Sequence, residues 1–481
     1  YFKFIIFCDF ITDKNRKSIY NHNIYFPNKG YIMNEIQKSR RDALKIFTLG
    51  SALAATSITI PTQAKAASDL SPNIAIIGAG LGGITMSAHL IDIMPKANVT
   101  LYDANQTMHY EPGFTLIAAG VYTTKDTKYD KADLIHEKVK WVKQNVQSVD
   151  PNNNSLTTND GNIHKYDYLI ISTGVYYDFQ SVKGLNADII EDPNSKITSI
   201  YTPNGATKAN KFIQELVKNG GNALFAEPNT PSKCGGANKK VNMLLNDLGQ
   251  KNNQKSLKTI LCTGGANMLS SPLHAKMIEQ IYIQRDMEYK TRHLLVEVDT
   301  INQIAKFDKL MPYTQDSIQK TAKERVEIPY DYLFVVPRMK SADFITQAGL
   351  NTSKGDVAGN WVDVDQYTLQ HKKYPNIFAL GDCAGVPKGK TGASIRKQYP
   401  VVGANILSHL KNEPLEAKFD GYTACPLLTR YGKAVMVEFN YKGAAPTLEC
   451  MGSTRESWLN WAVKVYLMKP MVMQAMIHAK A

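Results

Sequence analysis

A glycine motif behind a short apolar strand constrains the fold of this chain more than any other feature. Residues 73–77 (Asn-Ile-Ala-Ile-Ile) predict a buried strand, and Gly78, Gly80 and Gly83 follow it with the spacing Gly-x-Gly-x-x-Gly. Gly78 permits a tight turn, Gly80 lets the backbone approach a pyrophosphate, and Gly83 lets helix and strand pack closely. The stretch that continues to Met94 predicts a helix whose N-terminus offers N–H groups to phosphates. The pattern predicts a Rossmann-type dinucleotide site.

An acidic residue ends the second strand at the distance that this fold requires. Residues 99–102 predict the strand, and Asp103 follows the glycines by about 20 residues, where a carboxylate accepts hydrogen bonds from ribose hydroxyls. Val146 joins the expected cofactor-binding residues. Because strand, glycines, helix and acid occur in this order, we expect nucleotide binding rather than a ligand-free turn.

Two later segments indicate which dinucleotide binds. One is a strand that runs into Thr173-Gly174, and the other is a strand that ends in Gly381-Asp382. Both resemble the further FAD segments of flavoprotein oxidoreductases with two dinucleotide-binding domains, in which this aspartate binds ribityl and phosphate groups. Lys390 and Thr391 then open a helix that reaches residue 410, and its positive N-terminus would favour the negative charge of a reduced flavin. We expect FAD as the cofactor.

The middle of the chain lacks a second nucleotide fingerprint. The strand 221–225 runs into a segment with Lys233, Cys234 and Gly235-Gly236, and the strand 257–262 meets only Thr-Gly-Gly. Neither matches the Gly-x-Gly-x-x-Gly that binds NAD(P)H. We therefore expect a second Rossmann-like domain that has lost its ligand, and an electron donor other than NAD(P)H.

One cysteine stands where pyrophosphate-binding glycines would be. Cys234 lies between Lys233 and the pair Lys239-Lys240, just before a helical run, and nearby positive charge stabilises a thiolate. A second cysteine, Cys425, lies in the segment Tyr-Thr-Ala-Cys-Pro-Leu, after the flavin segments. Reactivity and a structural disulfide both remain open for this pair on the residues alone.

The two cysteine segments and the flavin motifs resemble those of the sulfide:quinone oxidoreductases, over about residues 74–477. The resemblance implies that Cys234 and Cys425 are a redox pair beside FAD, that hydrosulfide attacks their disulfide, and that one sulfur becomes a persulfide. Two electrons then pass through FAD to a membrane quinone, and the sulfur leaves to an acceptor. Which cysteine holds the persulfide stays open. Some members have a third cysteine in the first half of the chain, and here none lies between residue 67 and Cys234.

The remaining cysteines have simpler interpretations. Cys262 on an apolar strand predicts a buried small side chain. Cys383 follows the Gly-Asp motif, Cys450 fits a packing role, and Cys8 lies near the start of the chain.

The C-terminal segment predicts an amphipathic element that contacts the inner-membrane surface. Trp458, Trp461, Val465 and Met468 recur at spacings of three and four, and Pro470 begins a second short helix with further apolar residues. Paired tryptophans flanked by lysines suit a helix in the lipid interface, although packing on the protein's own core is the alternative. The lysines are Lys464, Lys469 and Lys480. Aromatic candidates for the quinone slot are Tyr399, Phe439 and Tyr441.

The first 66 residues have the anatomy of a leader. The first methionine is Met33, which we interpret as the true start, and Arg40-Arg41 precede a weakly apolar stretch and an Ala-Lys-Ala at 64–66. We expect twin-arginine export and a location on the periplasmic side of the inner membrane. These residues hold ten basic and four acidic side chains, so they supply six of the thirteen net positive charges. The remaining charge is modest, and we expect no nucleic-acid partner.

Composition and segment order predict an α/β protein with two Rossmann-like domains and C-terminal amphipathic helices. The 481 residues are 43% hydrophobic with 31 Gly and 21 Pro, which excludes a disordered or collagen-like chain. The expected divisions are a leader at 1–66, an FAD domain from 70–190 and 330–415, a second domain at 191–329, and a membrane-contact region at 416–481. Alternatives are a flavocytochrome c sulfide dehydrogenase flavoprotein, a type II NADH dehydrogenase and a redox-sensing binding protein. Homo-oligomerisation is possible, and no metal site is expected.

Overall fold

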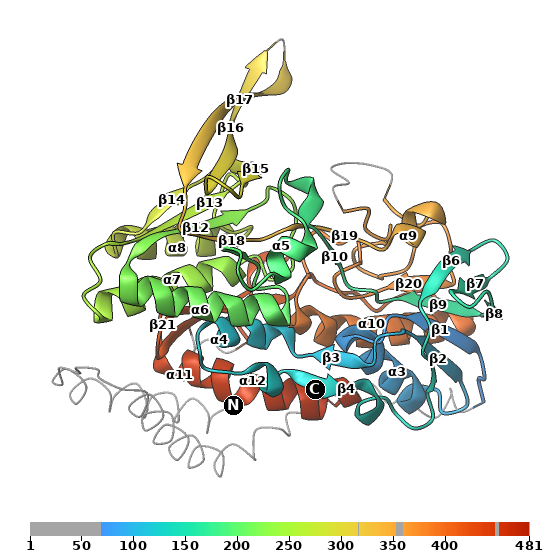
Figure 1. The fold of residues 1–481 in the computed structure, drawn as a ribbon. Coiled ribbons are helices and arrows are strands. Elements are labelled where there is room, and N and C mark those ends of the chain that lie inside the picture. The colour runs from blue at the N-terminus through green and yellow to red at the C-terminus, as the bar shows by residue number, and fades with distance from the viewer. Residues whose placement is uncertain (1–68, 316, 353–358, 448–451, 481) are drawn as a thin grey trace.

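Two parallel sheets with helices packed on them form the body of the protein, which confirms the expected α/β class (Figure 1). The structure is a computed structural model, and it describes residues 69–315, 317–352, 359–447 and 452–480. The leader with Arg40-Arg41, together with Cys8 and Cys450, lies outside the described residues.

The first sheet is assembled from two distant parts of the chain. Its strand order is β20-β9-β1-β2-β5, and Ile76 of β1 lies between Leu101 and Ile170 of its parallel neighbours. The central strands are apolar because they lie in one core, to which α3 (Leu81–Ile93) and α10 (Gly392–Leu410), packed against each other, contribute together with Val149 and Leu156. The strands are β1 (Asn73–Ile77), β2 (Asn98–Tyr102), β5 (Lys140–Val142), β9 (Tyr168–Ile171) and β20 (Ile377–Ala379).

The second sheet has the order β11-β18-β12-β13-β14. β18 lies beyond residue 330, where the sequence placed the return to the FAD domain, yet it pairs in parallel with β12. The return therefore begins after β18, because this apolar strand completes the second sheet. The strands are β11 (Ile197–Thr198), β12 (Gly221–Glu227), β13 (Leu257–Thr263), β14 (Glu288–Lys290) and β18 (Tyr332–Val335), and the helices are α6 (Pro203–Asn219), α7 (Ala237–Lys251) and α8 (Pro272–Gln284).

Three antiparallel sheets extend this body. The long strands β16 and β17 form a hairpin that projects from the second sheet's side of the molecule, with β15 alongside its base (Figure 1). The strands are β15 (His293–Asp299), β16 (Ile304–Gln315), β17 (Ile318–Pro329); β21 (Thr423–Arg430), β22 (Lys433–Asn440), β23 (Gly443–Ala444); and β6 (Val146–Asp150), β7 (Ser155–Thr158), β8 (Ile163–Lys165).

Short elements connect these layers. β10 and β19 pair across the junction between the two units, and β3 pairs with β4. Their bounds, with those of the short helices, are β3 (Thr107–His109), β4 (Lys128–Asp130), β10 (Tyr176–Asp178), β19 (Arg338–Lys340), α4 (Phe114–Ala118), α5 (Ala187–Glu191) and α9 (Asp343–Gln347).

The chain ends in a helical stretch from Trp458 to His478 that packs on the body. It comprises α11 (Trp458–Ala462), α12 (Met468–Pro470) and two π-helical turns, 463–467 and 471–475. A π-helix closes i→i+5 hydrogen bonds, so side chains shift in phase relative to an α-helix. No helix among the described residues is both long and apolar enough to cross a membrane.

We expect Gly83→Ala to destabilise the fold and Gly80→Ala to leave it nearly unchanged. A Cβ on Gly83 would lie 1.9 Å from the carbonyl oxygen of Gly78, whereas a Cβ on Gly80 has no atom within 4 Å. Overpacking against backbone costs roughly 1–3 kcal/mol. Thermal unfolding of the two variants measures the difference, and equal midpoints would contradict the role given to Gly83.

Candidate functional site

The glycine turn leaves open space at the start of α3. Gly78 adopts a φ of +100°, and a Cβ there would lie 2.4 Å from the carbonyl oxygen of Ser172. Gly80 is the N-cap of α3 and faces open space. The turn therefore has the shape that close approach of a phosphate to backbone N–H groups requires.

Asp103 ties the end of β2 to this turn. Its Oδ2 accepts hydrogen bonds from the backbone N–H of Ala79 at 2.9 Å and from Lys131 Nζ at 2.8 Å, and its Oδ1 accepts from Asn105 N at 2.9 Å. A carboxylate has about four acceptor positions, so one remains for a ribose hydroxyl. Val146 begins β6 and packs partly buried against the core of the first sheet.

The later flavin segments converge on the same sheet edge. Gly174 and Gly381 follow β9 and β20 with φ of +67° and +77°. Asp382 is half-buried, and its buried Oδ1 atom has no hydrogen-bond partner among the described residues. Burial raises the pKa of Asp382, and the ammonium groups of Lys233 and Lys390 oppose that shift. An unpaired buried carboxylate oxygen is costly, so its position fits a ligand hydroxyl that donates to it.

Lys390 and Thr391 hold the loop in front of α10. Lys390 Nζ donates to the carbonyl oxygens of Asp382 at 2.6 Å and Ala384 at 3.1 Å, and burial lowers its pKa to about 8. Thr391 caps α10 by accepting from Ser394 N. The N-terminus of this helix therefore lies beside the Asp382 loop, and together these residues fit the expected dinucleotide.

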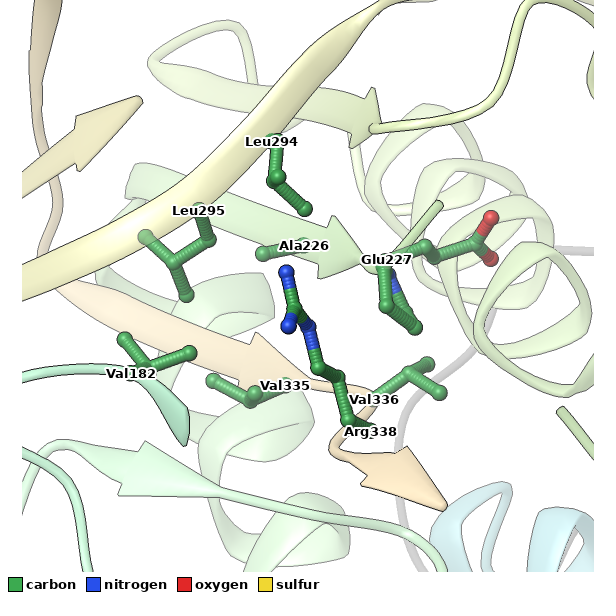
Figure 2. Close-up of a pocket in the computed structure, with 9 residues that line it drawn as sticks. Val182, Ala226, Glu227, Leu294, Leu295, Val335, Val336 and Arg338 are labelled. Atoms are coloured by element: carbon green, nitrogen blue, oxygen red, sulfur yellow. The ribbon is translucent and has the colours of Figure 1, made fainter. Parts of the chain in front are cut away.

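The corresponding edge of the second sheet is filled by side chains. Glu227 ends β12 and forms a buried ion pair with Lys239 of α7. Figure 2 shows Arg338 and several apolar side chains converging at this edge, where the cavity measures about 10 Å³. That volume holds roughly one water molecule. Its lining residues are Val182, Ala226, Glu227, Pro228, Leu294, Leu295, Val335, Val336 and Arg338.

The structure brings Cys234 and Cys425 together. Their sulfurs lie 3.4 Å apart, although 191 positions separate them in the chain. Cys234 lies in the turn between β12 and α7 with a φ of +47°, and Cys425 lies on β21, which packs against α7. The backbone N–H of Cys234 donates to the carbonyl oxygen of Lys390 at 3.1 Å. The cysteine pair therefore adjoins the loop that opens α10.

The surroundings shift the pKa values of the two thiols in opposite directions. The hydrogen bond from Cys425 lowers the pKa of Cys234, with further help from the ammonium groups of Lys240 and Lys464 against the effect of burial. Lys240 Nζ lies 3.3 Å from the Cys234 sulfur. The pKa of Cys425 is raised by its bond to Cys234 and by burial. In the reduced pair, these surroundings favour the thiolate at Cys234 over a thiolate at Cys425.

Lys464 lies in a different environment from the one that the sequence predicted. Its side chain was expected at a lipid interface, but it is buried and donates to the carbonyl oxygen of Pro112 at 2.7 Å. Burial and the charge of Lys240 lower its pKa to about 7, while the two cysteine sulfurs oppose the shift. In the sequence, only its position between Val463 and Val465, on a mostly apolar stretch, indicated that this lysine could be buried.

The apolar face predicted for lipid contact is packed mainly inside the protein. Trp461 and Val465 join Leu116, Leu244 and other side chains in a core cluster. Met473 and Met476 join the core of the first sheet, and Lys469 Nζ donates to the carbonyl oxygen of Asp126 at 3.0 Å. Of the four residues predicted to share a face, Trp461 and Val465 lie together in the cluster with Leu116, Met468 is half-buried and Trp458 is exposed. Trp458 and Met471 remain exposed at 39% and 38%.

The three aromatic candidates occupy different surroundings. Tyr399 is buried in the first core with its ring 5.0 Å from His89. Phe439 belongs to the second core, and Tyr441 stacks edge-on against Phe419, with its hydroxyl donating to the carbonyl oxygen of Gln366. Phe439 and Tyr441 lie two positions apart on and after β22.

The two other described cysteines are buried in the cores. Cys262 lies in the core of the second sheet, as expected, and burial raises its pKa to about 12. Cys383 is also buried, which raises its pKa. Thiols with raised pKa values are poor nucleophiles.

The fold is that of a flavin-dependent oxidoreductase with two Rossmann-like units. The family model described as pyridine nucleotide-disulphide oxidoreductase matches residues 72–216. The "Sulfide:quinone oxidoreductase, mitochondrial" of Dictyostelium discoideum is 30% identical over 409 residues, 85% of this chain and 86% of the relative. The mouse (Mus musculus) protein of the same name is 32% identical, over 76% of this chain and 78% of its own. The chain belongs to the sulfide:quinone oxidoreductase family.

A solved structure agrees with this fold. The sulfide:quinone oxidoreductase from Aquifex aeolicus superposes with a TM-score of 0.64 at 20% identity, covering 84% of this chain and 92% of the other. At this identity the likeness concerns the fold alone. It supports the two-unit architecture described above.

Replacing Lys240 should make Cys234 harder to ionise. The ammonium lies 3.3 Å from the Cys234 sulfur, and an opposite charge at such a distance lowers a pKa by about 1–3 units. We expect Lys240→Met to move the pH midpoint for alkylation of Cys234 upward by about one unit or more. The measurement is the iodoacetamide reaction rate of the reduced protein against pH, followed at the Cys234 peptide. Lys240→Arg keeps the charge and serves as the control; an unchanged midpoint in Lys240→Met would contradict the assignment.

Proposed function

We propose that this protein oxidises sulfide with FAD and passes the electrons to a membrane quinone, through a redox pair formed by Cys234 and Cys425. The observation that carries the proposal is the 3.4 Å separation of the two sulfurs beside the Lys390 loop. A disulfide needs only a small approach from that distance. Membership in the family and the Asp382 oxygen that fits a ribityl hydroxyl support the same chemistry.

The thiol pKa values favour one direction of attack. In the oxidised enzyme a hydrosulfide ion attacks the Cys425 sulfur, the S–S bond breaks, and Cys234 leaves as the thiolate. Thiol–disulfide exchange is faster when the leaving thiol has the lower pKa, and that thiol is Cys234. Cys425 then carries the persulfide, whose outer sulfur passes to an acceptor. Once the outer sulfur has left, Cys234 and Cys425 are both reduced and must re-form their disulfide. FAD held by Asp103, Asp382 and the N-terminus of α10 would supply the acceptor for the two electrons that this releases, on their way to the quinone.

The buried lysines complete the polar environment of this step. Lys240 holds the leaving thiolate at Cys234, and Lys464 has a pKa of about 7, so it gains or loses a proton near neutral pH. A hydrosulfide ion that enters is therefore met by positive charge. The proton that H₂S loses on forming the ion has an acceptor in neutral Lys464.

The structure bears on both the electron donor and the quinone that accepts the electrons. The filled edge of the second sheet, with its cavity of about 10 Å³, supports a donor other than NAD(P)H. Phe439 and Tyr441 are the better-placed quinone candidates, because Lys388 lies 5.5 Å from the Phe439 ring and also donates to the carbonyl oxygen of Asn440. Tyr399 stays a weaker candidate within the first core.

We further infer export by the twin-arginine motif to the periplasmic side of the inner membrane, with peripheral contact through the C-terminal stretch. The exposed Trp458 and Met471 support that contact. The stretch also packs on the core, so point substitutions test membrane contact better than deletion does.

Each cysteine of the pair should be essential for quinone reduction by sulfide. We expect Cys234→Ser and Cys425→Ser to reduce turnover with a soluble quinone to background, because neither variant can form the disulfide. Stopped-flow flavin bleaching by sulfide and quinone reduction are the measurements. Cys262→Ser is the matched control and should retain turnover. Wild-type turnover in Cys425→Ser would refute the redox pair, and bleaching by NADH would favour a type II NADH dehydrogenase.

Membrane contact should depend on the two exposed apolar residues of the C-terminal stretch. We expect Trp458→Ser with Met471→Ser to weaken flotation with anionic phosphatidylglycerol vesicles, because less apolar area enters the interface. Ile283→Ser on α8, whose side chain is 69% exposed, is the control. Equal flotation of both variants and the wild type would place lipid contact elsewhere.

A further inference from the structure

The β16–β17 hairpin extends well beyond the sheet that supports it. β16 and β17 pair along their whole length, but β15 reaches along β16 only as far as Lys309. Residues 310–315 and 318–323 therefore form a two-stranded ribbon that projects from the molecule (Figure 1). A two-stranded ribbon alone is marginally stable in water, so an additional partner would stabilise it.

One face of the ribbon carries a strip of apolar side chains that continues the protein core, and Lys309, Lys320 and Glu324 lie on the same face. Cross-strand pairing places Phe307 opposite Val326 and Met311 opposite Ala322, on the same face. Phe307 is buried in the core at the base, whereas Met311, Tyr313 and Ile318 are exposed at 38%, 45% and 60%. The opposite face carries polar side chains: Gln319, Thr321, Lys323 and Arg325. The ribbon thus carries an apolar strip that nothing in the described chain covers.

The outer edge of β17 is also open. In the described chain its strand neighbour is β16 alone, so the backbone N–H and C=O groups on its other side are free to pair. An exposed edge strand of this length is a template for pairing with another strand. We propose that a second copy of this chain pairs there, β17 against β17, with Ala322 of each copy at the two-fold axis.

Symmetry and charge select this register. A two-fold axis perpendicular to the sheet keeps side chains on their own face, so one residue must lie opposite itself. With Ala322 at the axis, Lys320 of each copy faces Glu324 of the other, and Ile318 faces Val326. Placing Lys323, Glu324 or Arg325 at the axis sets like charges opposite one another, which is destabilising. Placing Thr321 there pairs no opposite charges. Placing Val326 there pairs Arg325 with Glu327, but it moves the axis to the base of the hairpin, where Val326 is half-buried and Ile328 is buried.

The two charged residues are available for this contact. Glu324 is half-exposed beside Lys309, 3.0 Å away, and Lys320 Nζ donates to Gln315 Oε1 at 2.8 Å. In the dimer each Glu324 would lie between its own Lys309 and the Lys320 of the other copy. The result is a continuous four-stranded ribbon whose apolar strip is twice as wide. This proposal does not depend on the chemistry at Cys234.

A charge-swap experiment on the full chain tests the pairing. We expect the wild type to dimerise in sedimentation velocity, with Lys320→Glu and Glu324→Lys each weakening dimerisation roughly tenfold or more, because like charges then face one another twice. Mixing the two variants should restore a heterodimer. In that heterodimer two glutamates of the Lys320→Glu copy face two lysines of the Glu324→Lys copy, so both cross-strand pairs again join opposite charges. Lys323→Glu makes the same charge change on the opposite face and should dimerise like the wild type.

Several results would overturn the proposal. A wild type that stays monomeric at every concentration refutes it, as does a dimer that survives both single substitutions. Failure of the mixed variants to associate, while each keeps its flavin and its circular dichroism, also refutes the register. Vesicle binding that is lost in Lys320→Glu, without self-association of the wild type, would assign the ribbon to a lipid surface instead.

Discussion

The contact between Cys234 and Cys425 is the interaction on which the rest of the site depends. It joins the turn after β12 to strand β21, and a backbone hydrogen bond from Cys234 joins the same turn to the loop before α10. Three segments from different parts of the chain therefore meet at one pair of sulfurs. The left-handed φ of Cys234 shows how closely the turn must bend to reach them. Such conformations persist where the surrounding structure holds them in place.

The C-terminal stretch forms part of the protein core, although its amphipathic composition is also typical of a membrane-binding helix. Trp461 and Val465 pack in a core cluster, and Tyr122 donates its hydroxyl to the carbonyl oxygen of Val465 at 2.5 Å. These contacts place the ammonium of Lys464 where it acts on both sulfurs. Burying a second lysine beside Lys240 is costly, and the cost shows in its lowered pKa.

The second sheet keeps the Rossmann architecture while its ligand edge is closed. The Glu227–Lys239 pair and the side chains around Arg338 occupy the edge where such folds bind nucleotides. The same turn that lacks the glycines carries Cys234. The segment between β12 and α7 therefore carries Cys234 where a nucleotide-binding turn would carry its glycines.

Spacing along the chain was enough to predict the fold class, the glycine turn and the helices from Leu81 and from Gly392, and to single out Cys234 and Cys425 as candidates. These features rest on local spacing, and local spacing is visible in a single chain. Only tertiary packing brings Cys234 within 3.4 Å of Cys425, places β18 in the second sheet, and buries Lys464 inside the protein, where it donates to the carbonyl oxygen of Pro112. Those outcomes depend on which distant segments pack together, and an amphipathic pattern does not state whether core or membrane covers its apolar face.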